Sequence, residues 1–271
     1  MSAIDSGKRL YQRAVNLLSP RPIVFHHVPK CGGTSVGRAL RRAYLLSQAT
    51  VKPHESDKAF ASLQASERWP GFDVQDFRQM MLLYLLHNDT RCVAAHVPFS
   101  EVAFNEFGDS YAFVTILRDP VDRFLSNYRW NQRPGRPDRP TETLDEFLAH
   151  ARDRQTGATY VRYFCGDPGA ERFTAQHVDA AIRNLHRLHC VGFLDALPRF
   201  EAELNALTGR RIRVGKENVG RTTAADAPLL TPANQDVVLA ACALDRAVWD
   251  GVQDLRGTST PPSDPSTKSP D

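Results

Sequence analysis

Short apolar runs alternate along the chain with segments of helical periodicity. Four of these runs predict strands, at Ile23 to Val28, Cys92 to Val97, Tyr111 to Leu117 and Cys190 to Leu194. Strands that are separated by helices at this spacing pair in parallel, because the chain must cross back before each new strand. The sequence therefore predicts an α/β fold with a central parallel sheet of about four or five strands and helices on both faces.

Capping residues predict where several helices begin. Asp119 and Pro120 are an N-cap and a first-turn proline, and they open a helix that runs to about Asn131. Thr143 and Glu146 form a capping box for the next helix. Further helices are predicted over 34–46 and 175–188, over 198–207 with Gly209 closing it, and from a Thr231–Pro232 cap to about Leu255.

Composition divides the chain of 271 residues into three parts. Residues 21–256 have the mixture of apolar and charged residues that one globular domain requires. Residues 1–20 are expected to form an N-terminal helical arm. Residues 257–271 are rich in Ser, Thr and Pro, and we expect a disordered tail because they hold too few apolar side chains to form a core.

The sequence indicates neither a membrane protein nor a disulfide-rich secreted protein. The longest apolar run, Met80 to Leu86, is far shorter than the ~20 residues that span a bilayer. The N-terminus carries Asp5, Arg9 and Arg13 and does not resemble a signal peptide. Five widely spaced cysteines without a CxxC pair indicate neither a disulfide framework nor a zinc site. We therefore expect a protein of the reducing cytoplasm.

The net charge of +3 is too small to indicate a nucleic-acid partner, but arginine supplies 28 of the 34 basic residues. Arginine is favoured where planar anions are held through two hydrogen bonds, and the base composition of a genome gives the same bias. Both explanations stay open. Arg129, Arg133, Arg136 and Arg139 lie in or beside a Pro-rich loop at 131–143, which is either simply solvated or receives an anionic ligand such as an acidic sugar.

The segment after the first predicted strand has the composition of an anion-binding loop. It reads Pro29-Lys30-Cys31-Gly32-Gly33-Thr34-Ser35 and precedes a helix. The two glycines let the backbone approach a ligand closely, and the N–H groups at the start of the helix favour negative charge. Lys30 adds a cation. The pattern predicts a phosphate or sulfate cradle, and a Gly-rich turn with a solvated lysine is the alternative.

The order of these residues excludes a nucleotide-triphosphatase P-loop, whose lysine follows the last glycine. Here Lys30 precedes both glycines. The sequence Pro-Lys-x-Gly-Gly-Thr-Ser instead resembles the 5′-phosphosulfate loop of sulfotransferases, which take their sulfuryl group from 3′-phosphoadenosine 5′-phosphosulfate (PAPS). The pattern IxRDPxxRxxSxY, from Ile116 to Tyr128, resembles their 3′-phosphate motif and follows in the same order.

The resemblance is greatest to a carbohydrate branch of this family that includes the heparan sulfate uronyl 2-O-sulfotransferases. Three more segments look like those of the branch, namely Ala95-His96-Val97 with Phe107-Gly108, Tyr163-Phe164-Cys165-Gly166, and Val191-Gly192-Phe193. Similar segments run from about residue 23 to residue 223. Two features depart from the branch. Ala94 replaces the first histidine of its His-Gly-His, which concerns the acceptor more than sulfuryl transfer, and the membrane anchor of the Golgi members has no counterpart here.

The resemblance implies a P-loop-NTPase-like sulfotransferase fold and a cofactor role for each matched residue. The residues implied to bind the phosphosulfate are Lys30, Cys31, Gly32, Gly33, Thr34 and Ser35. Arg118 and Ser126 would hold the 3′-phosphate, Arg as a charged fork and Ser as one donor. The segment Lys216 to Thr223 resembles a late loop that closes over the nucleotide, and it implies contacts from Arg221 and Thr222.

His96 matches the catalytic histidine of the family. A neutral imidazole can take the proton of an acceptor hydroxyl, while Lys30 would stabilise the departing 5′-phosphate. His26 and His27 precede the anion loop and point to opposite faces of the sheet. One of the two is expected to contact the acceptor, with His27 as the candidate, and either of them is an alternative base.

One function is therefore expected, with two alternatives. The expected function is PAPS-dependent O-sulfotransfer in a bacterial cytoplasm to a sugar or glycoconjugate hydroxyl, with no metal, nucleic acid or membrane span. The first alternative is a small-molecule kinase, which needs Gly-Lys-Ser/Thr and a metal-binding aspartate after a strand; Asp119 comes near but caps a helix. The second is a non-catalytic nucleotide-binding module. Neither the acceptor nor the oligomeric state follows from the sequence.

Overall fold

A computed structural model describes residues 21–64, 72–133, 142–215 and 229–256. The N-terminal arm expected at 1–20 and the tail expected at 257–271 lie outside the described residues. Most of the Pro-rich loop, including Arg136 and Arg139, also lies outside them.

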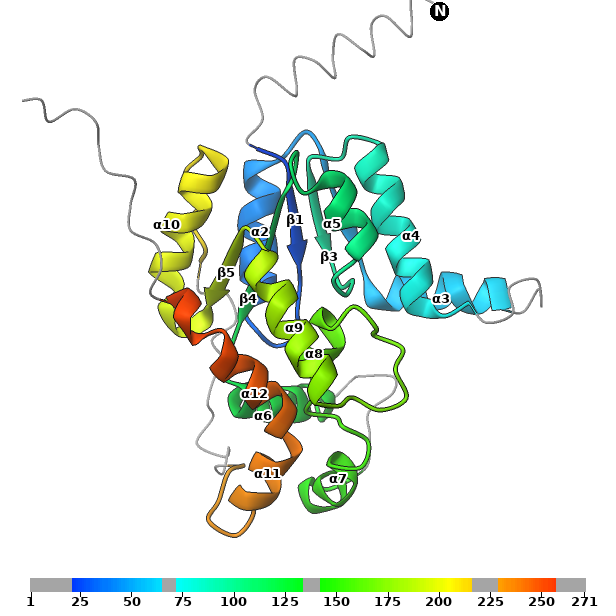
Figure 1. The fold of residues 1–271 in the computed structure, drawn as a ribbon, viewed down its shortest axis with the longest axis vertical. Coiled ribbons are helices and arrows are strands. Elements are labelled where there is room, and N and C mark those ends of the chain that lie inside the picture. The colour runs from blue at the N-terminus through cyan, green and yellow to red at the C-terminus, as the bar shows by residue number, and fades with distance from the viewer. Residues whose placement is uncertain (1–20, 65–71, 134–141, 216–228, 257–271) are drawn as a thin grey trace, which may run out of the picture.

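The centre of the protein is a parallel sheet of five strands. The strands are β1 (Ile23–His26), β2 (Gln48–Val51), β3 (Cys92–Ala95), β4 (Ala112–Leu117) and β5 (Cys190–Phe193). They lie in the order β2-β3-β1-β4-β5, and every neighbouring pair is parallel (Figure 1). Every residue of β1, β3 and β4 is buried. The predicted fold class is confirmed, and all four predicted strands are present.

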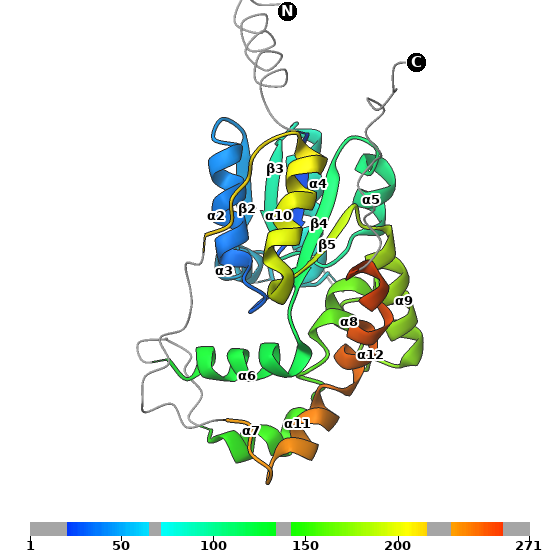
Figure 2. The ribbon, with the colours of Figure 1, turned by 90° about the vertical axis from the view of Figure 1, so that its left-hand side faces the viewer.

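Helices flank the sheet and cover its carboxyl end. Their bounds are α2 (Gly33–Ala43), α3 (Pro53–Gln64), α4 (Val74–His87), α5 (Glu101–Phe107), α6 (Pro120–Asn131), α7 (Leu144–Ala151), α8 (Thr159–Phe164), α9 (Ala175–Arg187), α10 (Leu197–Thr208), α11 (Gln235–Ala241) and α12 (Ala243–Gly251), with short 3₁₀ turns η1 (Leu194–Ala196) and η2 (Gln253–Arg256). In Figure 2, α2 lies on one side of the sheet and α5 on the other, and α6 runs below the carboxyl ends of the strands.

Two of the three predicted N-terminal capping signals are confirmed. The Asp119 side chain accepts from the N–H of Asp122 at the start of α6, and Thr143 and Glu146 form the predicted capping box of α7. Gly209 closes α10 with a φ of 68°, in the left-handed region where glycine meets no steric penalty.

Four helices and one strand were not predicted. They are α3, α4, α5, α8 and β2. The apolar run at Met80 lies in α4, whose buried side chains Arg78, Leu82 and Leu86 recur every fourth residue. β2 is an edge strand, and its sequence Gln-Ala-Thr-Val is only partly buried. A short polar edge strand has little hydrophobic signal, because one side of it pairs with nothing.

The single helix predicted from Thr231 to about Leu255 is wrong. The chain forms α11, with Asn234 as its N-cap, and then α12, with a break at Cys242. Asp245, on the first turn of α12, accepts hydrogen bonds from backbone N–H groups of α8. These bonds need α12 to start where it does, so tertiary packing overrides the continuous helical pattern.

No helix in the described part of the chain is long and apolar enough to cross a bilayer. All five cysteines are free and buried.

Candidate active site

The sheet order brings the loops after β3, β1 and β4 to one edge of the molecule. β1 lies between the other two strands, with His26 in register with Ala95 on one side and Thr115 on the other. Parallel strands all end at the same edge, where α/β proteins bind their ligands. The loop that contains Lys30, the residue His96 and the residue Arg118 therefore follow three adjacent strands.

The loop between β1 and α2 turns through two residues with positive φ before the helix begins. Gly32 is the N-cap of α2 with a φ of 79°, and Lys30 has a φ of 68°, which is strained for a residue with a side chain. No side chain caps α2, and its first turn contains no acidic residue. The N–H of Ser35 bonds back to the Gly32 carbonyl at 3.1 Å. The helix start is left with backbone donors and a positive dipole end, which suits an anion.

A stack of rings joins this loop to His96. The ring centroids of His27 and His96 lie 3.9 Å apart. The ring centroid of Phe25, on β1, lies 5.6 Å from that of His27. Gly33 packs against the same His27 ring so closely that a Cβ there would lie 2.0 Å from the imidazole. The His27 ring thus lies against both the first residue of α2 and His96.

Burial keeps both imidazoles of this stack neutral at pH 7. Desolvation lowers the pKa of His27 to about 3, with the nearby His96 adding to the effect. Desolvation also lowers the pKa of His96 to about 4, and the charge of Arg78 lowers it further. The Nδ1 atom of His96 is buried and has no hydrogen-bond partner among the described residues. His96 therefore presents a neutral ring at the carboxyl end of β3.

His26 points to the opposite face of the sheet, as alternation predicted. It is fully buried, lies among phenylalanine rings, and has Nδ1 3.0 Å from the carbonyl of Val97. Burial lowers its pKa to about 4. Its role is to join β1 to the segment after His96.

The second predicted anion site begins where β4 ends. Arg118 is partly exposed and forms an ion pair with Asp122 at 3.2 Å, one turn into α6. Further along α6, the ring of Trp130 lies 4.3 Å from Lys30 Nζ and 4.5 Å from the Arg133 guanidinium. α6 therefore reaches the anion loop. Ser126 lies one turn before Trp130 and so on the same side of the helix.

Tyr160, on α8, contacts the segments of both predicted anion sites. It is fully buried, and its Oη accepts the Arg118 N–H at 2.9 Å and also contacts the Arg118 carbonyl. The same oxygen lies 3.5 Å from Cys31 Sγ in the first loop. Burial raises the pKa of the Cys31 thiol to about 11, so this residue is a neutral packing group rather than a nucleophile.

A buried ion pair holds Tyr160 in place. The Asp245 carboxylate accepts from the N–H groups of Thr159, Tyr160 and Val161 at 2.9, 2.7 and 3.2 Å. Its charge is balanced by Arg123, whose Nε lies 3.7 Å away and whose side chain is 2% exposed. Burial raises the pKa of Asp245 to about 6. Arg123 belongs to the RDPxxR pattern, yet it is a core residue that anchors α8.

The structure thus brings together most of the predicted site. The residues placed around one edge of the sheet are Lys30, Cys31, Gly32, Gly33, Thr34, Ser35, His27, His96, Arg118 and Ser126. Arg221 and Thr222 lie outside the described residues. Sequence reasoning missed Trp130, Tyr160 and Asp245. Trp130 follows the predicted motif closely enough to have been noticed, but no local pattern links Asp245 to a helix more than eighty residues earlier.

Comparison with known proteins gives the family of the chain. Residues 18–190 match the model of the sulfotransferase family. A sulfotransferase from Alicyclobacillus acidocaldarius has a similar structure, with 18% identity and a TM-score of 0.47 over 86% of this chain and 95% of that one. Mouse sulfotransferase SULT7A1, solved in complex with PAP, has 18% identity and a TM-score of 0.40 over 92% and 83% of the two chains. No curated protein matches. Because the family model covers more than half of the chain, the protein belongs to the sulfotransferase family.

Proposed function

We propose that the protein transfers the sulfuryl group of PAPS to an acceptor hydroxyl, with His96 as the general base. The observation that supports this most is the stack that joins His96, His27 and Gly33, because it sets a candidate base against the loop that would hold the phosphosulfate. The base and the leaving-group cation Lys30 follow two neighbouring strands, β3 and β1.

The reaction is an in-line displacement at sulfur. The acceptor oxygen forms a bond to sulfur, the bond from sulfur to the 5′-phosphate oxygen breaks, and the hydroxyl proton passes to His96. The chain's contribution is to position the reactants and to stabilise charge, as in phosphoryl transfer. Backbone N–H groups at the start of α2 would bind the phosphosulfate oxygens, and Lys30 would neutralise the charge that develops on the leaving phosphate.

The low pKa of His96 fits a base that works beside an anion. In the protein without ligand, burial and Arg78 hold this pKa at about 4. A phosphosulfate bound at the adjacent loop brings negative charge, which favours the protonated imidazole and raises the pKa. The ring is therefore neutral before the reaction and becomes a better proton acceptor when the cosubstrate is present.

The 3′-phosphate of PAPS would bind at Arg118 and Ser126. The Asp122 carboxylate that pairs with Arg118 is exposed, so a phosphate can replace it at little cost. Arg221 and Thr222 remain proposed contacts from the late loop.

A carbohydrate hydroxyl is the proposed acceptor, on the resemblance of Ala95-His96-Val97 and the later segments to the branch that includes the uronyl 2-O-sulfotransferases. Ala94 is buried on β3, where that branch has its first histidine. The branch's uronyl acceptor is therefore not carried over.

Two measurements test the proposal. The first is a thermal-shift titration with adenosine 3′,5′-bisphosphate (PAP), AMP and ATP, in which a ligand at ~100 times its Kd stabilises the fold by ~2.7 kcal/mol. We expect stabilisation by PAP and not by AMP. Stabilisation by ATP alone would instead favour the kinase.

The second measurement uses His96→Gln and labelled PAPS with a panel of sugar acceptors. Removing the base should lower turnover by ~10²–10⁴-fold and leave PAP affinity unchanged. A variant with unaltered turnover would refute His96 as the base. A wild-type protein that binds PAP but turns over no acceptor would favour the non-catalytic module.

A further inference from the structure

The cation proposed to stabilise the leaving group contacts an aromatic ring on another element. Lys30 Nζ lies 4.3 Å from the centroid of the Trp130 ring. Trp130 is in the last turn of α6, and 40% of its surface is exposed. An ammonium within about 6 Å of a ring centroid is attracted to the negative face of the ring, and indole attracts it most strongly. The contact therefore restrains the end of a long, rotatable side chain.

The backbone of Lys30 is held in an uncommon conformation as well. Its φ of 68° lies in the left-handed region, which a residue with a side chain rarely adopts. Such strain persists where the surroundings impose it, and it is typical of functional positions. The turn of the anion loop (residues 29–35) fixes the backbone of this lysine, and Trp130 restrains its ammonium group.

The helix that carries Trp130 also carries the proposed 3′-phosphate site. Arg118 precedes α6 by two residues, and Ser126 lies one turn before Trp130 on the same side of the helix. In Figure 2, α6 runs below the carboxyl ends of the strands. One helix thus links the residues proposed for the 3′-phosphate to the lysine proposed for the 5′-phosphate.

A second cation lies against the same ring. The Arg133 guanidinium is 4.5 Å from the centroid of Trp130. The ring attracts both positive groups, while the two groups repel each other. An anion that binds at the loop reduces this repulsion, so the pair of cations favours an occupied anion loop.

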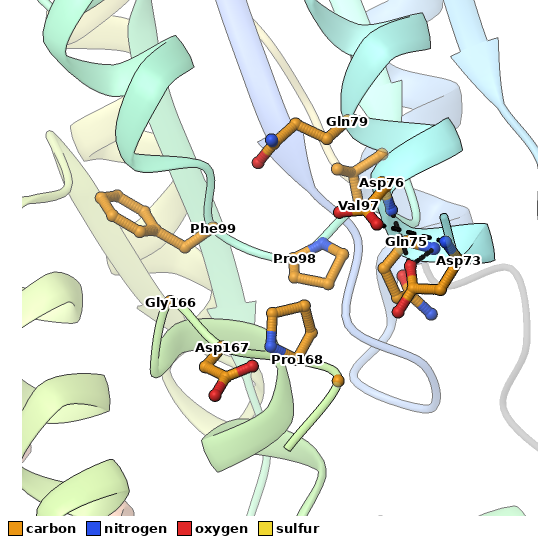
Figure 3. Close-up of a pocket in the computed structure, with 11 residues that line it drawn as sticks. Asp73, Gln75, Asp76, Gln79, Val97, Pro98, Phe99, Gly166, Asp167 and Pro168 are labelled. Carbon is orange, nitrogen blue, oxygen red and sulfur yellow. Dashed lines mark hydrogen bonds between the residues drawn. The ribbon is translucent and has the colours of Figure 1, made fainter. Parts of the chain in front are cut away.

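A cavity of about 320 Å³ opens beside α4. Figure 3 shows that residues of α4, 97–99 and 166–169 surround it, and the described residues that line it include none from α6 or from the anion loop. Its charged lining residues are Asp73, Asp76 and Asp167. Carboxylates repel an anionic cosubstrate, so the phosphosulfate is expected beside Lys30 rather than in this cavity.

We propose that Trp130 is a positioning residue of the transferase, whose ring holds the Lys30 ammonium where it neutralises the leaving phosphate. The inference rests on the proposed function, and Trp130 acts through Lys30 rather than on the reacting atoms. Negative charge grows on the 5′-phosphate as its bond to sulfur breaks, and this charge is complete in PAP. The position of Lys30 therefore affects the transition state and PAP more than it affects bound PAPS.

The kinetic test removes the ring and keeps an apolar side chain. The attraction of an exposed cation to a ring corresponds to a factor of about 2–5. Trp130→Leu should lower kcat with labelled PAPS by this factor and weaken PAP binding equally, with a smaller change in the KM for PAPS. Trp130→Phe retains a ring and should recover part of both losses. Tyr84→Leu makes a matched change at an exposed aromatic residue of α4 and should leave all three values unaltered.

A second measurement follows the lysine without turnover. The chain has six lysines, and reductive methylation with ¹³C-formaldehyde keeps their charge and gives each a methyl signal in NMR spectra. Lys30→Arg assigns the signal of Lys30. The ring current of Trp130 should shift this signal upfield in the wild-type protein, less so in Trp130→Phe and not in Trp130→Leu.

The outcomes separate this inference from the proposed function. An unchanged or higher kcat in Trp130→Leu, equal effects of Trp130→Leu and Tyr84→Leu, or a Lys30 signal that does not move on loss of the ring would each overturn the inference. A wild-type protein that does not bind PAP would instead refute the proposed function. The Lys30 signal of the ligand-free protein tests the contact with Trp130 in either case.

Discussion

Substitution of Gly33 by alanine tests how the anion loop and the candidate base are coupled. The backbone of Gly33 is outside the left-handed region, so alanine is conformationally allowed there. The new Cβ would lie 2.0 Å from His27 Cδ2 and 2.2 Å from its Nε2. Carbon atoms in contact lie about 3.5–4.0 Å apart, so the ring has to move by about 1.5 Å. The His96 ring already lies against that ring, with 3.9 Å between the two centroids.

The expected cost has a stability part and an activity part. Forcing a methyl group into a filled site destabilises a protein by about 1–3 kcal/mol. A displacement of the base by about 1 Å costs about 10²-fold in turnover. Both effects should appear together in Gly33→Ala, as a lower midpoint in urea unfolding and a lower kcat with labelled PAPS.

Gly37 provides a matched control on the same helix. A Cβ at Gly37 would meet only the far end of the flexible Arg41 side chain, at 3.1 Å. Gly37→Ala should therefore keep full turnover and gain about 0.5–1 kcal/mol of stability from helix propensity. A second test combines Gly33→Ala with His27→Ala, since deleting the obstructing ring should recover part of the lost stability. If Gly33→Ala were as stable and as active as Gly37→Ala, the coupling of loop and base through His27 would be refuted.

Two other predictions concern the buried groups around the site. Tyr160→Phe leaves the Arg118 N–H without its buried acceptor, which should lower the unfolding free energy by about 1–3 kcal/mol and weaken PAP binding in calorimetry; unchanged values for both would contradict the bridging role. Burial holds the pKa values of His26 and His96 at about 4, below the ~6.5 of an unfolded chain, so the unfolded state binds protons first as the pH falls. The unfolding free energy measured in urea should fall by about 1 kcal/mol per histidine between pH 7 and pH 5.5. Asp245 offsets part of this fall, because its pKa is raised to about 6 and the folded protein therefore takes up its proton first. A rise in the unfolding free energy over this range would refute the assignment.

The sheet was predictable because its central strands are buried on both faces. Their residues are nearly all apolar, so each reads as a short hydrophobic run between helices. β2 escaped prediction because its pairing with β3 stabilises it, and backbone pairing leaves no hydrophobic pattern. The C-terminal segment was predicted as one long helix because its helical period continues through Cys242. The break there depends on the contact of Asp245 with α8, which the sequence pattern does not show.

In the candidate site, too, the residues near strand ends were predictable and the residues that hold them in place were not. Lys30, His96 and Arg118 were predictable because each lies within four residues of a strand end, and strand ends meet at one edge of the sheet. The contacts that hold them come from elsewhere in the chain. Tyr160 bonds the Arg118 backbone across 42 positions, and Asp245 bonds Tyr160 across 85.

This division explains why Arg123 was open to misreading. In the sequence it belongs to the same short pattern as Arg118 and Ser126, the two residues for which the resemblance implies a phosphate contact. In the fold, Arg118 is at the end of β4 and partly exposed, whereas Arg123 points into the core and pairs with Asp245. Removal of one partner of a buried pair costs about 3–5 kcal/mol, so changes at Arg123 would abolish binding by unfolding α8. Loss of nucleotide binding in an Arg123 variant is therefore no sign of a phosphate contact, whereas the same loss in a stably folded Arg118 variant is.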